Sequence, residues 1–248
     1  MKTYWIESFL EKWSAGDYRI LSGSALKVLA MVMMLIDHSA RFVLRDNPSF
    51  ATPFFSFYGH DVSLNYLMTF VGRWAFPIFA FLIVEGFLHT RNRFRYGRNL
   101  LVFAFISEIP WNLIHSGTLF WSTQNVFFTL FLGYLGLCVI EKYENQKSKM
   151  AISLLVLLFV PIILRTDYSS TGFGFILMLY VLRNQKILQA VIGCSILSSH
   201  WIGALAFIPI NMYNGKRGFV QSKIVKYSFY AFYPLHLLLL WWIRSYLL

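Results

Sequence analysis

The sequence predicts an all-α, polytopic integral membrane helix bundle, and two observations support this prediction. Hydrophobic residues make up 57% of the 248 residues and charged residues only 13%, whereas soluble domains are about one quarter charged. The apolar residues also fall in repeated blocks of about 18–20 residues, the length of helix that crosses roughly 30 Å of hydrocarbon. Composition and block length therefore point to the same fold class.

About nine of these blocks are interpreted as transmembrane spans. They cover roughly residues 26–44, 67–89, 98–115, 125–141, 150–164, 171–183, 186–198, 200–213 and 226–247. The sixth to eighth blocks are short, and we expect them to be tilted or partly re-entrant. Residues 1–25 are predicted to form an amphipathic segment on the cytoplasmic surface, and residues 26–248 to form a single transmembrane domain.

The basic residues predict the orientation of the chain. The net charge of +11 comes from lysines and arginines clustered before the first span, after the second and fourth spans, and before the ninth. The intervening loops carry almost none. By the positive-inside rule, the N-terminus is cytoplasmic and the C-terminus lies outside. Because the charge is confined to short loops between apolar blocks, we expect a lipid bilayer and no nucleic acid as a partner.

A small number of ionisable residues lie inside the predicted spans, where they usually face the bundle interior or a water-filled cavity. They are Asp37 and His38 in the first span, Arg73 in the second, Glu108 in the third and His236 in the ninth. At 1.5 Å per residue, His38 lies roughly 18 Å from the inner surface and Arg73 roughly 9 Å from the outer surface. We expect these residues to line one chamber in the middle to outer half of the membrane.

Further polar residues lie toward the predicted outer side. Asn112 shares a helix face with Glu108 because the two are four residues apart, and Gln124 and Asn125 lie at the outer end of the fourth span. The outer loops and span ends add Asp167, Tyr168, His115 and His200. These residues are candidates for binding an acceptor, whereas hydrogen bonds between helices are the alternative role for the three amides.

The cytoplasmic loops contain a second candidate site. Four arginines occur in TRNRFRYGR and two more cations in NGKRG, namely Arg91, Arg93, Arg95, Arg98, Lys216 and Arg217. Arginine binds phosphate in a bidentate manner and lysine binds it as a point charge. We therefore expect a polyphosphate ligand to enter from the cytoplasm. The sequence has no P-loop and no cysteine–histidine cluster with metal-ligand spacing, so no metal is expected.

The sequence resembles the TraX family, whose namesake is the conjugative-plasmid enzyme that N-acetylates pilin. The resemblance runs from about Leu26 to His236 and rests on LKVLAMVMMLIDHSARF, GRWAFPIFAFLIVEGFLHTRNRFRYGRNLLVFAFISEIPWNL, QNVFFTLFLG, DYSSTG and NGKRG…KYSFYAFYPLHL. It implies a multi-pass acyltransferase of the bacterial cytoplasmic membrane. In such an enzyme, acetyl-CoA (acyl-CoA) docks on the cytoplasmic face. The acyl group then reaches an amine or hydroxyl of a peptide N-terminus, a glycan or another small acceptor on the outer side.

The resemblance also implies site residues, which are carried over position by position. The residues expected to line the reaction chamber are Asp37, His38, Arg73, Glu108, Asn112, Gln124, Asn125 and His236. On the cytoplasmic side, Arg95 and Arg98 in RYGR are similar to the paired-arginine motif of the wider acyltransferase superfamily.

The expected mechanism is direct transfer with His38 as the general base. The acceptor, once deprotonated, attacks the thioester while Arg73, Asn112 or Asn125 stabilises the oxyanion and Glu108 or Asp37 orients these groups. His236 is the rival for the base, and a covalent intermediate on Ser107 is the less favoured variant. The alternative functions are a transporter of a small polar or anionic solute and a structural membrane protein without chemistry.

Overall fold

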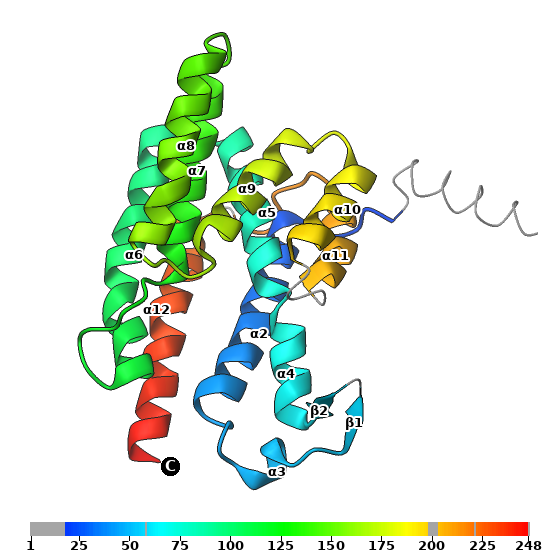
Figure 1. Cartoon of the computed structure of the whole chain (residues 1–248), viewed down its shortest axis with the longest axis vertical. Coiled ribbons are helices and arrows are strands. Elements are labelled where there is room, and N and C mark those ends of the chain that lie inside the picture. Colours follow the sequence, from blue (N-terminus) through cyan, green and yellow to red (C-terminus); the bar gives the residue numbers. More distant parts are fainter. Residues whose placement is uncertain (1–17, 58, 198–202, 221, 248) are drawn as a thin grey trace, which may run out of the picture.

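The structure of the protein is a computed structural model that describes residues 18–57, 59–197, 203–220 and 222–247. Its helices are α2 (Gly23–Phe42), α3 (Pro48–Ala51), α4 (Leu64–Gly72), α5 (Ala75–His89), α6 (Arg93–Ser116), α7 (Val126–Lys142), α8 (Lys147–Ile163), α9 (Ser169–Val181), α10 (Lys186–Ile196), α11 (Phe207–Asn211) and α12 (Lys223–Tyr246). Strands β1 (Phe55–Phe57) and β2 (His60–Val62) pair antiparallel in a short hairpin. The prediction of an all-α fold is therefore confirmed, with this hairpin as a small addition (Figure 1).

The predicted spans coincide with helices along most of the chain. Helix α2 begins at Gly23, three residues before the predicted start of the transmembrane domain, and most of the predicted 1–25 segment lies outside the described residues. The block predicted over 200–213 differs most. Residues 200–202 lie outside the described part, and α11 is only five residues long, or roughly 7.5 Å at 1.5 Å per residue. Helix α11 is therefore too short to cross a bilayer by itself.

The basic loops gather at one end of the bundle. Arg93 at the start of α6 pairs with Glu141 near the end of α7 at 3.0 Å. At the other end, Arg244 of α12 donates to the carbonyl of Ile114 in the last turn of α6 at 3.3 Å. In Figure 1 the turn between α7 and α8 is at the top, whereas the C-terminus and the hairpin are at the bottom. These contacts place the start of α6 and the end of α7 at one end and the C-terminus at the other, while the predicted orientation of the chain in the membrane stays a prediction.

The surface of the bundle is apolar on several helices. Pro161 is the one buried residue of α8, and Leu155, Phe159 and Ile163 of that helix are 53–77% exposed. Exposed apolar faces of this extent are typical of helices in contact with lipid. By length and composition, two described stretches could cross a membrane, Gly23–Phe42 and Leu64–His89. These features indicate a membrane protein, and the count of nine spans stays a prediction.

The second predicted span bends at Arg73 and Trp74. These two amides donate to carbonyls three residues back, on Phe70 and Val71, as in a tighter 3₁₀ turn. The cause is Pro77, which has no N–H to donate to the Arg73 carbonyl and disfavours a regular helix there. The helix is therefore divided into α4 and α5 at the level where Arg73 meets α2.

Helices α2 and α4 approach closely because position 72 has no side chain. A Cβ added to Gly72 would overlap the Cβ of Asp37, and the Asp37 carboxyl would be within 2.8 Å. This contact places Asp37 directly against the α4–α5 bend. Gly72 therefore brings the carboxylate and Arg73 to the same depth in the bundle.

We expect Gly72→Ala to destabilise the protein by roughly 1–3 kcal/mol, because the new methyl group must displace Asp37 and the α2 backbone. Gly174→Ala is the matched control, since a Cβ there meets nothing within 4 Å and alanine favours a helix over glycine by about 1 kcal/mol. Thermal unfolding in detergent should show a lower Tm for Gly72→Ala alone. Equal Tm values for the two variants would contradict the close approach of α2 and α4.

Candidate active site

A small buried cavity of about 80 Å³ lies where α2, the α4–α5 bend, α6 and the α8–α9 turn meet. Its polar and charged lining residues are Asp37, His38, Arg41, Arg73, His115, Asp167 and Tyr168. Aromatic and aliphatic side chains complete the wall. The cavity therefore collects ionisable groups from segments far apart in the sequence.

A hydrogen bond between two histidines adjoins this cavity. The Nδ1 atom of His38 lies 2.7 Å from Nε2 of His236, and the two rings are nearly parallel with centroids 5.0 Å apart. The Nδ1 atom of His236 lies 2.8 Å from the carbonyl oxygen of Phe232. Since a carbonyl can only accept, His236 carries its proton on Nδ1 and presents a lone pair at Nε2.

This arrangement decides the tautomer of His38 as well. With Nε2 of a neutral His236 as acceptor, the proton of His38 lies on Nδ1 and its own Nε2 keeps a free lone pair. His38 lines the small cavity. His38 therefore has a lone pair on Nε2, as a general base requires. His236 is hydrogen-bonded to Nδ1 of His38 and lies where it can accept the proton of that nitrogen.

Two carboxyl groups, from Asp37 and Asp167, and two guanidinium groups, from Arg41 and Arg73, line the small cavity. Arg41 binds Asp37 at 3.0 Å across one turn of α2, whereas the guanidinium of Arg73 forms no ion pair within the described residues. Burial raises the pKa of Asp167 to about 6, against the opposing effect of Arg41 and of the Tyr168 amide. Asp167 therefore gains or loses a proton close to neutral pH.

The α8–α9 turn that carries Asp167 is held firmly in place. The hydroxyl of Thr129 donates to the carbonyl of Asp167, and the Asp167 amide donates to the carbonyl of Gln124 at 2.8 Å. Tyr168 stacks on Phe76 with ring centroids 3.7 Å apart. These contacts fix both predicted loop residues against α5 and α7.

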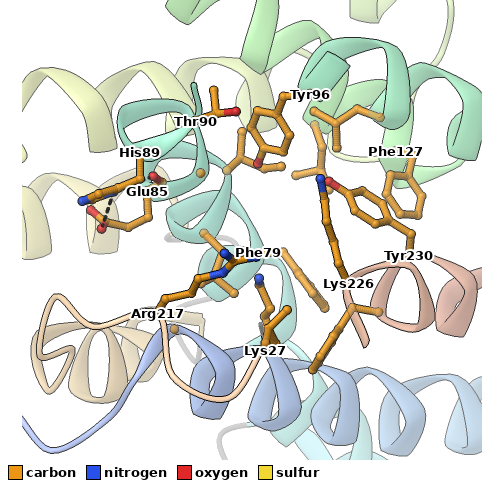
Figure 2. Close-up of a pocket in the computed structure, with 18 of the residues that line it drawn as sticks. Lys27, Phe79, Glu85, His89, Thr90, Tyr96, Phe127, Arg217, Lys226 and Tyr230 are labelled. Atoms are coloured by element: carbon orange, nitrogen blue, oxygen red, sulfur yellow. Dashed lines mark hydrogen bonds and ion pairs between the residues drawn. The ribbon is translucent and has the colours of Figure 1, made fainter. Parts of the chain in front are cut away.

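A second, larger cavity of about 730 Å³ lies beside the first and reaches the basic end of the bundle. Its walls come from α2, α5, α6, α7, α12 and the segment before α12 (Figure 2). Exposed Arg91 and Arg217 stand at the surface, while Phe79, Phe127 and Tyr230 line its interior. One carboxylate also lines the cavity, Glu85, which lies 3.6 Å from Nδ1 of His89. Since cations outnumber it, the cavity has a basic mouth and an aromatic interior.

Three cations from separate segments converge in this larger cavity: Lys27, Arg217 and Lys226. Lys27 is close enough to the other two to be repelled by both, and Figure 2 shows Lys27 and Arg217 extending toward each other. None of the three has an ion pair within the described residues. Their mutual repulsion is unfavourable without an anion, so the mouth is suited to bind one.

Local hydrogen bonds place Arg217 at this mouth. The Gly23 amide at the start of α2 donates to the Lys216 carbonyl at 2.8 Å. The Ser24 hydroxyl donates to the carbonyl of Arg217 at 2.7 Å and accepts from the Val220 amide at 3.0 Å. The start of α2 thereby anchors the NGKRG segment.

The two cavities share a wall. Five residues line both of them: Met34, Phe79, Val126, Leu130 and Tyr233. Side chains from α2, α5, α7 and α12 therefore form a common boundary between the basic-mouthed cavity and the small cavity beside the histidine pair.

The structure brings together some of the residues predicted from the sequence. Asp37, His38, Arg73, His115, Asp167 and Tyr168 line the small cavity, His236 contacts His38, and Arg91 and Arg217 line the large one. Four of the six cations predicted to bind phosphate line neither cavity: Arg93, Arg95, Arg98 and Lys216. Arg93 instead pairs with Glu141 and lies 3.6 Å from the ring centroid of Phe87.

The remaining predicted residues lie outside both cavities and join structural elements. The Asn125 amide donates to Glu108 at 2.5 Å and to the Ala104 carbonyl at 2.8 Å, which ties α7 to α6. Asn112 donates to the carbonyl of Leu119 at 2.7 Å in the following loop. The backbone of Gln124 pairs with the α8–α9 turn. The candidate nucleophile Ser107 lines neither cavity, and His200 lies outside the described residues.

Sequence reasoning missed four residues that the structure places in the site: Lys27, Arg41, Lys226 and Tyr233. Helical spacing was the available signal for two of them. Arg41 follows Asp37 by four residues and Tyr233 precedes His236 by three, so each shares a helix face with a predicted residue. Lys27 and Lys226 belong to the basic clusters near the first and ninth predicted spans, from which the sequence predicts only the orientation of the chain.

The fold and the two cavities define a helical membrane protein with a buried, histidine-centred polar site that adjoins a basic pocket. The chain belongs to the TraX family, since the family model described as TraX protein matches residues 22–244. It is also similar to a probable fimbrial assembly protein FimC, serogroup H1, of Dichelobacter nodosus. The two are 30% identical over 252 residues, which cover 88% of this chain and 94% of that protein. No solved structure matches the chain.

Proposed function

We propose that the protein is a multi-pass acyltransferase of the bacterial cytoplasmic membrane. In this proposal it transfers an acyl group from cytoplasmic acyl-CoA to an amine or hydroxyl acceptor on the outer side. The observation that supports it best is the shared wall between the basic-mouthed cavity and the histidine-lined cavity. Membership of the TraX family and similarity to a fimbrial assembly protein agree with chemistry on a surface component.

The size and the charge of the larger cavity support acyl-CoA as the proposed co-substrate. A volume of about 730 Å³ lies within the range of ligand pockets. Acyl-CoA carries its phosphates and its thioester at opposite ends of a flexible arm. Lys27 precedes His38 by eleven residues on α2, and Lys226 precedes His236 by ten on α12. At 1.5 Å per residue, the cations are separated from the imidazoles by roughly 15–17 Å. In this proposal, phosphates bound at the mouth leave the thioester near the shared wall.

In the reaction, the acceptor enters the small cavity from the outer side. His38 removes its proton through Nε2, the nucleophile attacks the thioester carbon, and the carbonyl oxygen becomes an oxyanion. Collapse of this intermediate breaks the C–S bond and releases CoA thiolate toward the basic cavity. The imidazolium of His38 is stabilised by its hydrogen bond to His236, while Asp37 remains paired with Arg41.

Replacing His38 with alanine should abolish acyl transfer while acetyl-CoA binding persists, because the cations of the mouth are unaffected. General base catalysis contributes about 10²–10⁴-fold, so release of CoA thiol by purified protein with acetyl-CoA and an amine or hydroxyl acceptor should fall by at least that factor. A variant that keeps more than about a tenth of the wild-type rate, a loss of only about 1.4 kcal/mol, would place the base elsewhere. Uptake of intact acetyl-CoA into vesicles without thiol release would indicate a transporter.

Neutral replacements in the basic mouth should weaken binding of acetyl-CoA. Hydrogen bonds to charged groups contribute about 1.5–3 kcal/mol, so Lys27→Met, Arg217→Gln and Lys226→Met should each raise the Kd by roughly tenfold or more. Lys147→Met is the matched control, since Lys147 is an exposed lysine at the same end of the bundle that lines neither cavity. Equal Kd values for all four variants and the wild type, measured by calorimetry, would refute this phosphate site.

A further inference from the structure

Tyr233 occupies an unusual position on α12. It is 4% exposed and lines both cavities, and its hydroxyl donates no hydrogen bond within the described residues. A buried polar group without a partner costs about 1–3 kcal/mol. This cost suggests that the hydroxyl gains a partner when a ligand enters.

Within the described residues no neighbouring group accepts a hydrogen bond from the Tyr233 hydroxyl, although the Val126 amide at the start of α7 lies close enough to donate to its oxygen. Its ring packs edge-on against His38 at 6.3 Å, His236 at 5.6 Å and Phe127 at 5.3 Å between centroids. The two imidazoles already use their facing nitrogens for each other. Tyr233 therefore lies beside the proposed base, His38, and its hydroxyl makes no hydrogen bond to that residue.

Other buried donors without a partner do not occupy a comparable place. Five other buried donors are also unpaired in the described part of the chain: the indole N–H of Trp74, one N–H of the Arg93 guanidinium, the amide of Asn99 and the hydroxyls of Ser107 and Thr166. None of these five residues lines either cavity. Of the buried side-chain donors without a partner in that part, Tyr233 is thus the one that a ligand in these cavities can reach.

The start of α7 adds to the electrostatics at this point. Asn125 caps the helix by accepting a hydrogen bond from the Phe127 amide at 3.0 Å. Val126, the first residue of α7, lines both cavities together with Tyr233. The N-terminal end of a helix carries partial positive charge that favours a developing anion.

We infer that Tyr233 is a catalytic residue that donates its hydrogen bond to the carbonyl oxygen of the thioester and stabilises the oxyanion during acyl transfer. This role rests on the proposed function. In the step, the nucleophile gives its proton to His38 and forms a bond to the carbonyl carbon, and the oxygen takes up negative charge at the Tyr233 hydroxyl. The charge returns to form the C=O bond as CoA leaves as the thiolate, and Tyr233 keeps its proton throughout.

The test is Tyr233→Phe, which deletes the hydroxyl and keeps the ring. Loss of one oxyanion-hole donor typically lowers kcat by about 10²–10³-fold. We expect this loss in single-turnover acyl transfer at saturating acetyl-CoA, with a Kd for acetyl-CoA within about twofold of wild type. Because the hydroxyl donates to no protein group and loses at most the contact of its oxygen with the Val126 amide, the Tm should stay close to that of the wild type.

Tyr134→Phe is the matched control. Tyr134 is equally buried, its hydroxyl donates to the Arg93 carbonyl at 2.7 Å, and it lines neither cavity. This variant should lose stability and keep its rate. Isotope-edited infrared spectroscopy of bound acetyl-CoA gives a readout besides turnover. The thioester carbonyl band should lie lower in frequency in the wild type than in Tyr233→Phe.

The two possible failures are distinguishable. A Tyr233→Phe protein that transfers acyl groups within about threefold of the wild-type rate, with an unshifted carbonyl band, overturns the role of Tyr233 alone. Wild-type protein that binds no acetyl-CoA and releases no thiol overturns the proposed function and this role with it.

Discussion

The hydrogen bond between His38 and His236 is the interaction on which the site depends. It joins α2 to α12, two helices that begin at the same basic end and carry Lys27 and Lys226 near their starts. One contact between side chains therefore aligns two helices whose cations and imidazoles lie at matching separations. The Phe232 carbonyl completes the arrangement, since it determines which nitrogen of each ring carries a proton.

Departures from regular helix geometry create space and polarity around this pair. Pro77 releases the Arg73 carbonyl and bends the chain where Arg73 enters the small cavity. Gly72 lets Asp37 approach the bend, and the α8–α9 turn adds a carboxylate, Asp167. Irregular backbone at membrane depth is tolerated where it is buried in protein or lines a cavity. Bends and turns thus coincide with the polar residues, as expected for a functional site.

The sequence predicted the helices well because long apolar blocks leave little choice of secondary structure. It also selected Asp37, His38, Arg73 and His236, since charge inside a span is costly and marks the bundle interior. It could not separate these from Glu108 and Asn125, which are also polar residues of the predicted spans but pair with each other. Which face of a helix meets a cavity depends on packing between distant segments. For the same reason, the convergence of Lys27 with Arg217 and Lys226 was visible only in the structure.

The proposed function requires one route that carries an acyl group from the basic end of the bundle to the opposite end. Sealed proteoliposomes of known protein orientation test it most directly, with radiolabelled acetyl-CoA on one side and a membrane-impermeant peptide amine on the other. The account predicts labelled peptide only when acetyl-CoA is on the side of the basic loops and the peptide is on the side of the C-terminus. Labelling when both are on the basic side alone, or transfer in the reverse orientation, would contradict it.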